Sequence, residues 1–274
     1  SDTDVYNIFF PLMISWLFLE SFILRQNKKT KKYIYAGIAG LFTGIFAFTW
    51  DAWWYIFDFI IISMVGYFIY LIFVHKKYFH KTIKMKNLLV TFASYVFSTI
   101  IFVTIFRGFS AMLGAIKGPL SFLFLKEAAK ETLWPNVYTT VAELGDTSLS
   151  QVINTLGGPL LTILVIFSIS LFFIKKNKKQ YDIKYGMFLG IWFLGTLYSS
   201  LAGLRFSMFL VPVYAIALGI LAGKAYNFIT NKLSKTLELN KKFVSIILII
   251  LLIVMFISPI KSAHTTAVGE IPQM

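Results

Sequence analysis

Two aspartates stand one residue apart at the start of the sequence, immediately before a long apolar stretch. Asp2 and Asp4 lie in SDTDVYNIFF. In an extended segment residues i and i+2 point the same way, so the pair suits a hard divalent cation such as Mg²⁺ or Mn²⁺, which prefers oxygen ligands. Acidic residues also favour the N-terminus of a helix, where the dipole stabilises negative charge. The spacing therefore leaves two interpretations, a metal site and a solvated helix start.

Two more charged residues have types suited to the same chemistry. Glu143 lies in YTTVAELGD, a polar stretch in which an acid is ordinarily solvated, although Trp134, Pro135 and Tyr138 nearby indicate a segment that docks onto something. Arg205 is the one charge in SSLAGLRFSMFLVP. An isolated arginine of this kind pairs with a phosphate or reaches along apolar surface to the membrane interface, and the stretch alone leaves both open.

The stretch FTWDAWWYIF carries a further acid, Asp51, among tryptophans typical of the outer membrane interface. A functional acid is one interpretation of Asp51. We expect instead that its side chain caps a tight turn between two helices.

Composition places these residues on a membrane protein. The chain has 274 residues, of which 58% are hydrophobic, with a mean hydropathy of +0.75, whereas soluble domains are about 45–50% apolar. A helix needs roughly 17–25 apolar residues to cross a bilayer. The sequence therefore predicts an all-α membrane protein, a polytopic helical bundle of about eight transmembrane helices. The predicted spans are 5–24, 33–50, 53–74, 88–106, 159–174, 185–201, 206–228 and 243–260.

Charge sets the orientation of these spans. Twenty of the 26 lysine and arginine residues fall in the four connections that follow the first, third, fifth and seventh spans, when the last connection is counted from Lys224 near the end of its span. By the positive-inside rule this side is cytoplasmic, so the net charge of +14 reflects topology and not a nucleic-acid partner. Asp2, Asp4, Glu143 and Arg205 then all lie at the external face, which we expect to be that of the cell (plasma) membrane. Because the chain has no cysteine, disulfide and thiol chemistry are excluded.

One external loop, 107–158, is unusually long. Its first part, GFSAMLGAIKGPLSFLFL, is apolar but contains Lys117 and a Gly118–Pro119 break, so we interpret it as an interfacial or re-entrant segment and not as a span. The second part is polar, with a helix predicted over 125–133 and ended by Pro135. Loops of this length in compact domains are usually functional or disordered.

The three candidate motifs and their order resemble the catalytic subunit of oligosaccharyltransferase, the Stt3/AglB/PglB family. SDTDVYNIFFPL resembles the second external D-x-D motif of that family, which precedes a transmembrane helix. TVAE, residues 140–143, resembles its TIxE or SVSE motif in a long external loop, and AGLRFSMFLVPVYA is similar to its arginine-bearing helix start. The resemblance covers nearly the whole chain, but only part of a family member, and its composition leans towards an archaeal form.

The resemblance implies a membrane-embedded GT-C-type glycosyltransferase and a role for each residue. Asp2 and Asp4 would bind the divalent metal, Mn²⁺ or Mg²⁺. Glu143 would complete the metal site and hold the acceptor amide, so that Asp2 and Glu143 are the catalytic residues. Arg205 would bind the phosphate of a lipid-linked oligosaccharide of the dolichyl type. The glycan would pass to the asparagine of an N-x-S/T sequon in an acceptor protein, at the external membrane face.

The sequence departs from the family pattern in three ways. Val141 replaces the more usual isoleucine. The family's first external acidic motif and its sequon-reading WWDYG domain have no counterpart in residues 1–274. We therefore expect 1–274 to be a partial transmembrane catalytic domain, with the external loop 107–158 within it, that is inactive alone.

Three other functions fit parts of the pattern. A protein mannosyltransferase-like enzyme also uses external acids and a polyprenyl-phosphate sugar, but its signature acids lie in the first external loop. A lipid flippase or transporter would carry charged residues at the middle of its spans, where this sequence has few. A structural membrane subunit would tolerate substitution of its external acids.

Overall fold

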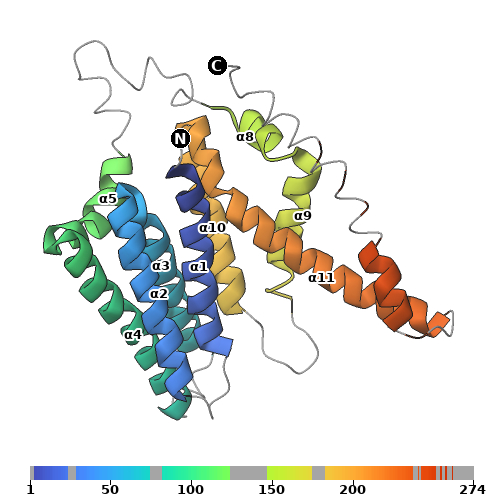
Figure 1. Ribbon diagram of the computed structural model, residues 1–274, viewed down its shortest axis with the longest axis horizontal. Helices are drawn as coiled ribbons and strands as arrows, with labels where there is room; N and C mark the ends of the chain where they lie inside the picture. The colour runs from blue at the N-terminus through green and yellow to red at the C-terminus, as the bar shows by residue number, and fades with distance from the viewer. Residues whose placement is uncertain are drawn as a thin grey trace. The chain divides into compact units, whose positions relative to one another are not determined.

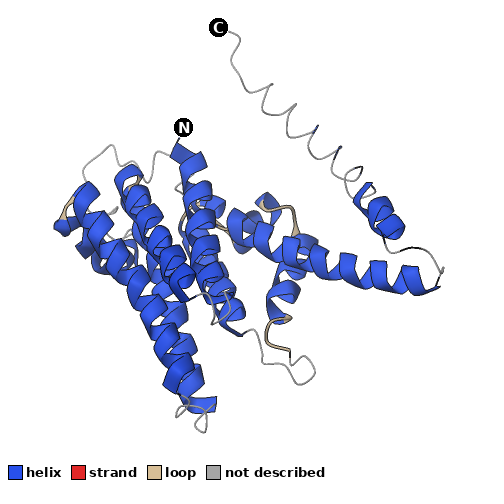
Figure 2. Cartoon of the chain, turned by 60° about the horizontal axis from the view of Figure 1, so that its bottom comes forward, coloured by secondary structure: helices blue, strands red, loops and turns tan. Residues whose placement is uncertain are grey.

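The described residues of the computed structural model form helices joined by short loops, with no strand among them (Figure 2). The described residues are 3–23, 29–74, 82–123, 147–174, 183–236, 240, 242–250, 254, 257 and 261. Six helices in these ranges are long and apolar enough to cross a membrane, or seven if one bent pair counts as a span. The all-α polytopic membrane fold is thus confirmed. The predicted number of eight is not confirmed, and the last predicted span, 243–260, is described only in part.

The chain divides into two compact units, Ser1–Ala217 and Leu218–Met274. The first unit holds the helices from α1 to η6 and the start of α11, and the second unit holds the rest of α11 and the described helical residues 242–250. In chain order the elements are α1 (Thr3–Ile23), α2 (Lys29–Thr49), η2 (Asp51–Trp53), α3 (Trp54–Val74), α4 (Thr82–Arg107), η4 (Phe109–Leu113), α5 (Gly114–Leu123), α8 (Leu149–Thr155), α9 (Pro159–Ser170), α10 (Ile183–Ala202), η6 (Leu204–Phe209) and α11 (Val211–Thr236).

In the first unit, α2 packs between α1 and α4, and α3 packs on α10 (Figure 1). Small residues let α2 and α4 approach closely. A Cβ added at Gly44 would lie 2.5 Å from the Cβ of Phe102, and the Ser98 hydroxyl donates to the Gly37 carbonyl at 2.7 Å. The glycines of α2 are therefore part of a helix–helix contact.

The core of this unit is aromatic. The Tyr95 ring of α4 is fully buried, with its centroid 4.9 Å from that of Phe18 in α1 and 5.9 Å from that of Phe57 in α3. Its hydroxyl lies 3.3 Å from the Thr43 hydroxyl of α2. One side chain thus joins three neighbouring helices and fixes the frame on which the outer ends are built.

The predicted span 159–174 begins where expected, at Pro159, but the helix ends at Ser170. Its 12 residues rise about 18 Å, less than a bilayer needs. It passes the length and apolarity criteria only together with α8, from which it is bent by 88°. Gly157 and Gly158 form the bend with φ of 97° and 92°, a backbone conformation that favours glycine. This element is a broken span or a re-entrant loop.

The apolar first part of the loop predicted to be external forms two short helices, η4 and α5, and α5 packs on α3. With ten residues, α5 rises only about 15 Å, consistent with an interfacial or re-entrant segment. The helix predicted over 125–133 lies outside the described residues.

The predicted span 206–228 begins later, because residues Leu204–Phe209 form the 3₁₀ helix η6 and α11 starts at Val211. Pro212 is the second residue of α11, where its missing N–H costs no helical hydrogen bond. In the second unit, α11 continues from Leu218, and its Tyr226 hydroxyl is hydrogen-bonded to that of Ser245.

Candidate functional site

Arg205 lies on η6, between α10 and α11. A 3₁₀ helix has three residues per turn, so Phe206 and Phe209 share one side of η6. Phe209 is buried and Arg205 is exposed. The turn therefore presents its one cation to the surface while two phenylalanines hold it to the bundle.

The partners of Phe209 come from the connection between α2 and α3. Its ring centroid lies 5.2 Å from that of Trp50 and 5.1 Å from that of Tyr55. Trp50 also contacts Phe46 of α2, with centroids 5.8 Å apart. Aromatic contacts of this kind add about 0.5–1.5 kcal/mol each beyond the buried area, so they fix η6 firmly at this end of the first unit.

An apolar cavity of about 220 Å³ opens beside η6. Aromatic side chains dominate its wall, and Gly195 of α10 makes room for it, because a Cβ there would lie 2.5 Å from the Phe59 ring. The residue after Arg205, Phe206, is part of the wall. The lining residues are Trp50, Ala52, Trp54, Tyr55, Phe59, Pro119, Gly195, Thr196, Tyr198, Ser199, Phe206 and Phe209.

The start of α1 lies at the same end of the unit, because α1 contacts η6 and the Phe10 ring stacks on Phe46, with centroids 5.5 Å apart. Pro11 lies inside α1 and has no N–H to donate to the carbonyl four residues earlier. This frees the Asn7 carbonyl, and the Tyr55 hydroxyl donates to it at 3.4 Å. A single side chain, Tyr55, thus contacts α1, η6 and the cavity.

Asn7 itself is only 2% exposed, and its side-chain oxygen Oδ1 has no hydrogen-bond partner among the described residues. An unsatisfied buried polar atom costs about 1–3 kcal/mol, so such atoms are rare in native proteins. Asn7 follows Asp4 by three residues, which places both on one side of α1 about one turn apart.

Asp51 does not cap the turn, and that prediction is wrong. Trp50 holds the N-cap position of η2, and no side chain caps this helix. Asp51 pairs instead with Arg107 at the end of α4. The Arg107 guanidinium also donates to the Ala47 carbonyl at 2.9 Å and to the Trp50 carbonyl at 3.4 Å. Carbonyls at a helix C-terminus lack intrahelical donors and favour a cation, so an arginine 60 residues away completes the end of α2.

The second described part of the loop 107–158 is also held to the bundle. The Thr147 hydroxyl donates to the Ser200 carbonyl of α10 at 2.5 Å. Ser148 then caps α8 through a capping box with Gln151. The two described parts of the loop 107–158 are therefore tied to α2 at Arg107 and to α10 at Thr147.

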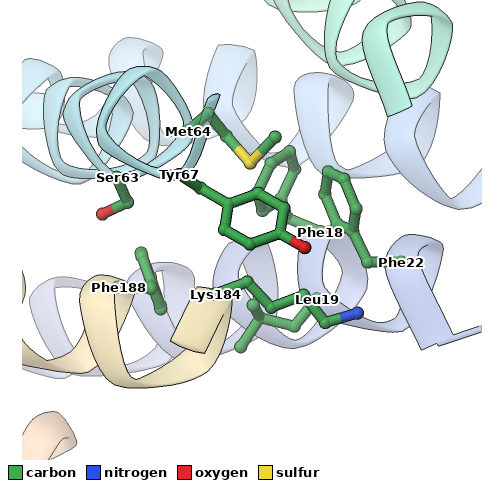
Figure 3. A pocket seen from close by; sticks show the side chains of 8 residues that line it. All are labelled: Phe18, Leu19, Phe22, Ser63, Met64, Tyr67, Lys184 and Phe188. Carbon is green, nitrogen blue, oxygen red and sulfur yellow. The ribbon is translucent and has the colours of Figure 1, made fainter. Parts of the chain in front are cut away.

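A second pocket lies at the opposite ends of these helices, where α1, α3 and α10 meet (Figure 3). The side chains of Tyr67 and Lys184 enter it from α3 and α10, and the Lys184 ammonium lies 5.9 Å from the Phe22 ring centroid. Its volume is about 10 Å³, room for about one water molecule. It is too small to hold a phosphorylated lipid.

The predicted site residues are described to different extents. Arg205 is placed with its side chain, and Asp4 lies in the first turn of α1, with its side chain outside the described part. Asp2 and Glu143 lie outside the described residues. Within the described ranges no three His, Cys, Asp or Glu side chains gather as a metal site. The structure thus brings the start of α1 to the turn that carries Arg205, and the predicted metal site stays a prediction.

Comparison with known proteins places the chain among its relatives. Residues 1–259 match the family model "Oligosaccharyl transferase STT3, N-terminal". The chain belongs to the STT3 family. STT3-like proteins of two methanogens are named dolichyl-phosphooligosaccharide-protein glycotransferase. The relative from Methanococcus voltae is 31% identical over 265 residues, which are 87% of this chain and 29% of that protein. The relative from Methanocaldococcus jannaschii is 30% identical over 236 residues, 83% of this chain and 25% of that protein.

This STT3 chain therefore spans less than a third of the length of the curated relatives it matches. No solved structure matches it. Family membership and the run of apolar helices together make the chain an integral membrane protein.

Sequence reasoning missed the cavity, the Arg107 contacts and Asn7. One signal for Asn7 was present, because Pro11 four residues later leaves the Asn7 carbonyl without its helical donor. The cavity had none, since its wall joins residues from 50 to 209 that no local pattern connects.

Proposed function

We propose that the chain is the membrane-embedded part of an oligosaccharyltransferase that moves a glycan from a dolichyl-type lipid phosphate to the asparagine of an N-x-S/T sequon. The observation that carries this proposal is an exposed arginine on a turn whose next residue enters an apolar cavity. A phosphorylated lipid needs both features side by side. The names of the STT3 relatives support the same donor and acceptor. The charge asymmetry of the connections supports an active site at the external face of the cell membrane.

The donor would bind in two parts. The Arg205 guanidinium would hold phosphate oxygens through charge-assisted hydrogen bonds. The first part of the isoprenoid chain would leave the bilayer and enter the aromatic cavity of about 220 Å³, where van der Waals packing against the rings would hold it. The rest of the chain would stay in the bilayer. This arrangement fixes the bond between the sugar and the phosphate at the membrane surface.

The carboxylates Asp2, Asp4 and Glu143 form a donor set that suits Mg²⁺ or Mn²⁺. The unpaired Asn7 oxygen, one turn from Asp4, fits a polar centre at this place. When bound, the ion would stabilise negative charge on the phosphate as it departs.

The protein residues would act on the acceptor. An asparagine amide is a poor nucleophile, because its lone pair is delocalised into the carbonyl. Glu143 and Asp2 would accept hydrogen bonds from the amide N–H groups and weaken that delocalisation. The amide nitrogen would then bond to C1 of the first sugar while the C1–O bond to phosphate breaks. The electron pair leaves with the lipid phosphate, whose charge Arg205 stabilises, and the amide proton passes to solvent through the carboxylate that holds it.

Transfer of a lipid-linked glycan to a sequon peptide by the full-length protein tests the proposal. We expect Asp2→Ala, Asp4→Ala and Glu143→Ala each to reduce transfer by at least 100-fold, and Arg205→Ala to raise the KM for the donor more than that for the peptide. Lys232→Ala removes a positive charge from an exposed position in the second unit and is the matched control. Wild-type transfer by all three acidic variants would refute the catalytic assignment.

The same assay tests the alternative donors. A mannosyltransferase-like enzyme would use a lipid-phosphate monosaccharide and hydroxyl acceptors. Transfer to serine or threonine, and none to the sequon asparagine, would contradict the proposed acceptor.

A further inference from the structure

Asn7 is the residue of the external end that the proposed function leaves without a role. Its side chain is 98% buried, and its Oδ1 atom has no hydrogen-bond partner in the part of the chain that the structure describes. Four residues on, Pro11 ensures that the Asn7 backbone carbonyl also lies outside the helical hydrogen bonds, and Tyr55 takes that carbonyl. The Tyr55 hydroxyl therefore satisfies the backbone carbonyl of Asn7, and the side-chain oxygen Oδ1 is left without a donor.

The position of Asn7 on α1 places it next to the proposed site. Asn7 and Asp4 are three residues apart on α1, so their Cα atoms differ by about 4.5 Å along the axis and lie on the same side. Tyr55 holds this turn of α1 against Phe209, whose ring is 5.1 Å away on the arginine-bearing turn. Asn7 thus lies one turn from Asp4 and is joined through Tyr55 to the turn that carries Arg205.

A carboxamide oxygen accepts hydrogen bonds and needs a donor. The acidic residues proposed to hold the metal are acceptors when ionised and cannot supply one. Arg205 cannot be that donor either, since Oδ1 has no partner among described residues. A water molecule has two protons and can donate one to Asn7 and one to a carboxylate. Small divalent ions keep several waters when bound to carboxylates.

We propose that Asn7 is a positioning residue for the metal site: its Oδ1 accepts a hydrogen bond from a water in the hydration shell of the divalent ion. This inference rests on the proposed function. It accounts for a polar side chain kept at a fully buried position of a membrane helix, where an apolar residue of the same size would cost nothing in packing. Groups that orient a metal site from outside the ligand set typically contribute 10–100-fold to metal affinity.

The test is Mn²⁺ affinity of the full-length protein in nanodiscs, measured by electron paramagnetic resonance of free Mn²⁺ without donor or acceptor. Asn7→Leu keeps the number and branching of the side-chain heavy atoms and removes the acceptor, so Kd should rise about 10–100-fold. Asn7→Asp keeps an acceptor oxygen in the same place, so Kd should stay within about threefold of wild type or fall. Asn7→Ala removes the acceptor without added bulk and replaces the leucine variant if that one does not fold.

Ser15 supplies the matched control on the same helix. It is 1% exposed, and its hydroxyl likewise has no partner among the described residues, but it lies eight residues on, about 12 Å further along the axis. Ser15→Ala should leave the Mn²⁺ Kd unchanged. Thermal unfolding without Mn²⁺ checks that every variant folds, and Asn7→Leu should match or exceed wild type there.

Two results would overturn the inference. One is an unchanged Kd in Asn7→Leu and Asn7→Ala, which would leave Asn7 as a buried amide satisfied by an internal water. The other is a Kd raised equally in Asn7→Asp and Asn7→Leu, which would assign the effect to packing. Failure of the wild-type protein to bind Mn²⁺ is a separate result, because it would refute the proposed metal site itself and the inference with it.

Discussion

Arg107 provides the sharpest test of how the end of α2 is held to α4. Its guanidinium makes one good bond, to the Ala47 carbonyl at 2.9 Å, and one long bond, to the Trp50 carbonyl at 3.4 Å, besides the ion pair with Asp51. Hydrogen bonds from a charged donor contribute about 1.5–3 kcal/mol. The long bond adds roughly 0.5 kcal/mol, the low end of the range for neutral pairs. Asp51 is 86% exposed, and an exposed ion pair contributes about 0–1 kcal/mol.

The hydrogen bonds from Arg107 to the two carbonyls should therefore contribute more to the free energy of unfolding than its ion pair with Asp51 does. We expect Arg107→Ala to destabilise the protein by about 2–4 kcal/mol, and Asp51→Ala by less than about 1 kcal/mol. Arg107→Lys should fall between them, because a lysine ammonium lacks the planar fork that reaches two acceptors. For a domain of this size, about 3 kcal/mol corresponds to a fall in Tm on the order of 6–12 °C.

The assay is thermal unfolding of the full-length protein in nanodiscs, followed by tryptophan fluorescence, at low and high salt. High salt should reduce the small difference in Tm between wild type and Asp51→Ala, because salt screens exposed charges. The lower Tm of Arg107→Ala should persist at high salt. If Asp51→Ala lowers the Tm as much as Arg107→Ala does, the ion pair holds the turn, and the larger contribution assigned to the carbonyl hydrogen bonds is refuted.

Two pairs of glycine variants give the remaining predictions. Gly44→Ala places its Cβ 2.5 Å from a side chain of α4 and should lower the Tm, whereas Gly37→Ala meets nothing within 4 Å and should be neutral or stabilise by up to about 1 kcal/mol. Thermal unfolding compares them, and equal losses would contradict the close α2–α4 contact. Gly118→Ala would collide with the Trp54 indole at the cavity wall, so donor KM should rise several-fold. Gly114→Ala, with its nearest neighbour at 3.9 Å, is the control, and equal KM values would contradict this cavity as the donor site.

Much of the helical frame could be predicted from the sequence. The predicted spans 5–24, 53–74 and 185–201 agree with α1, α3 and α10 to within two residues at each end, because a membrane span needs a continuous apolar stretch that any window along the chain reveals. The start of α9 at Pro159 was equally local, whereas the bend at Gly157–Gly158 was not predicted. The predicted cap by Asp51 failed, since the local preference of an acid at a turn lost to an arginine that approaches from another helix.

The candidate site likewise has features that the sequence predicts and features that only the structure shows. The acids and Arg205 are recognisable by type, spacing and membrane side, which are properties of the sequence itself. The contact of Phe209 with Trp50, the bond from Arg107 to a carbonyl 60 residues earlier and the unpaired oxygen of Asn7 were decided only by the tertiary structure. Each depends on which helix faces lie against one another and on the shapes of the side chains between them. Hydropathy and charge determine that a helix crosses the membrane and in which direction, but they leave its rotation and its neighbours open.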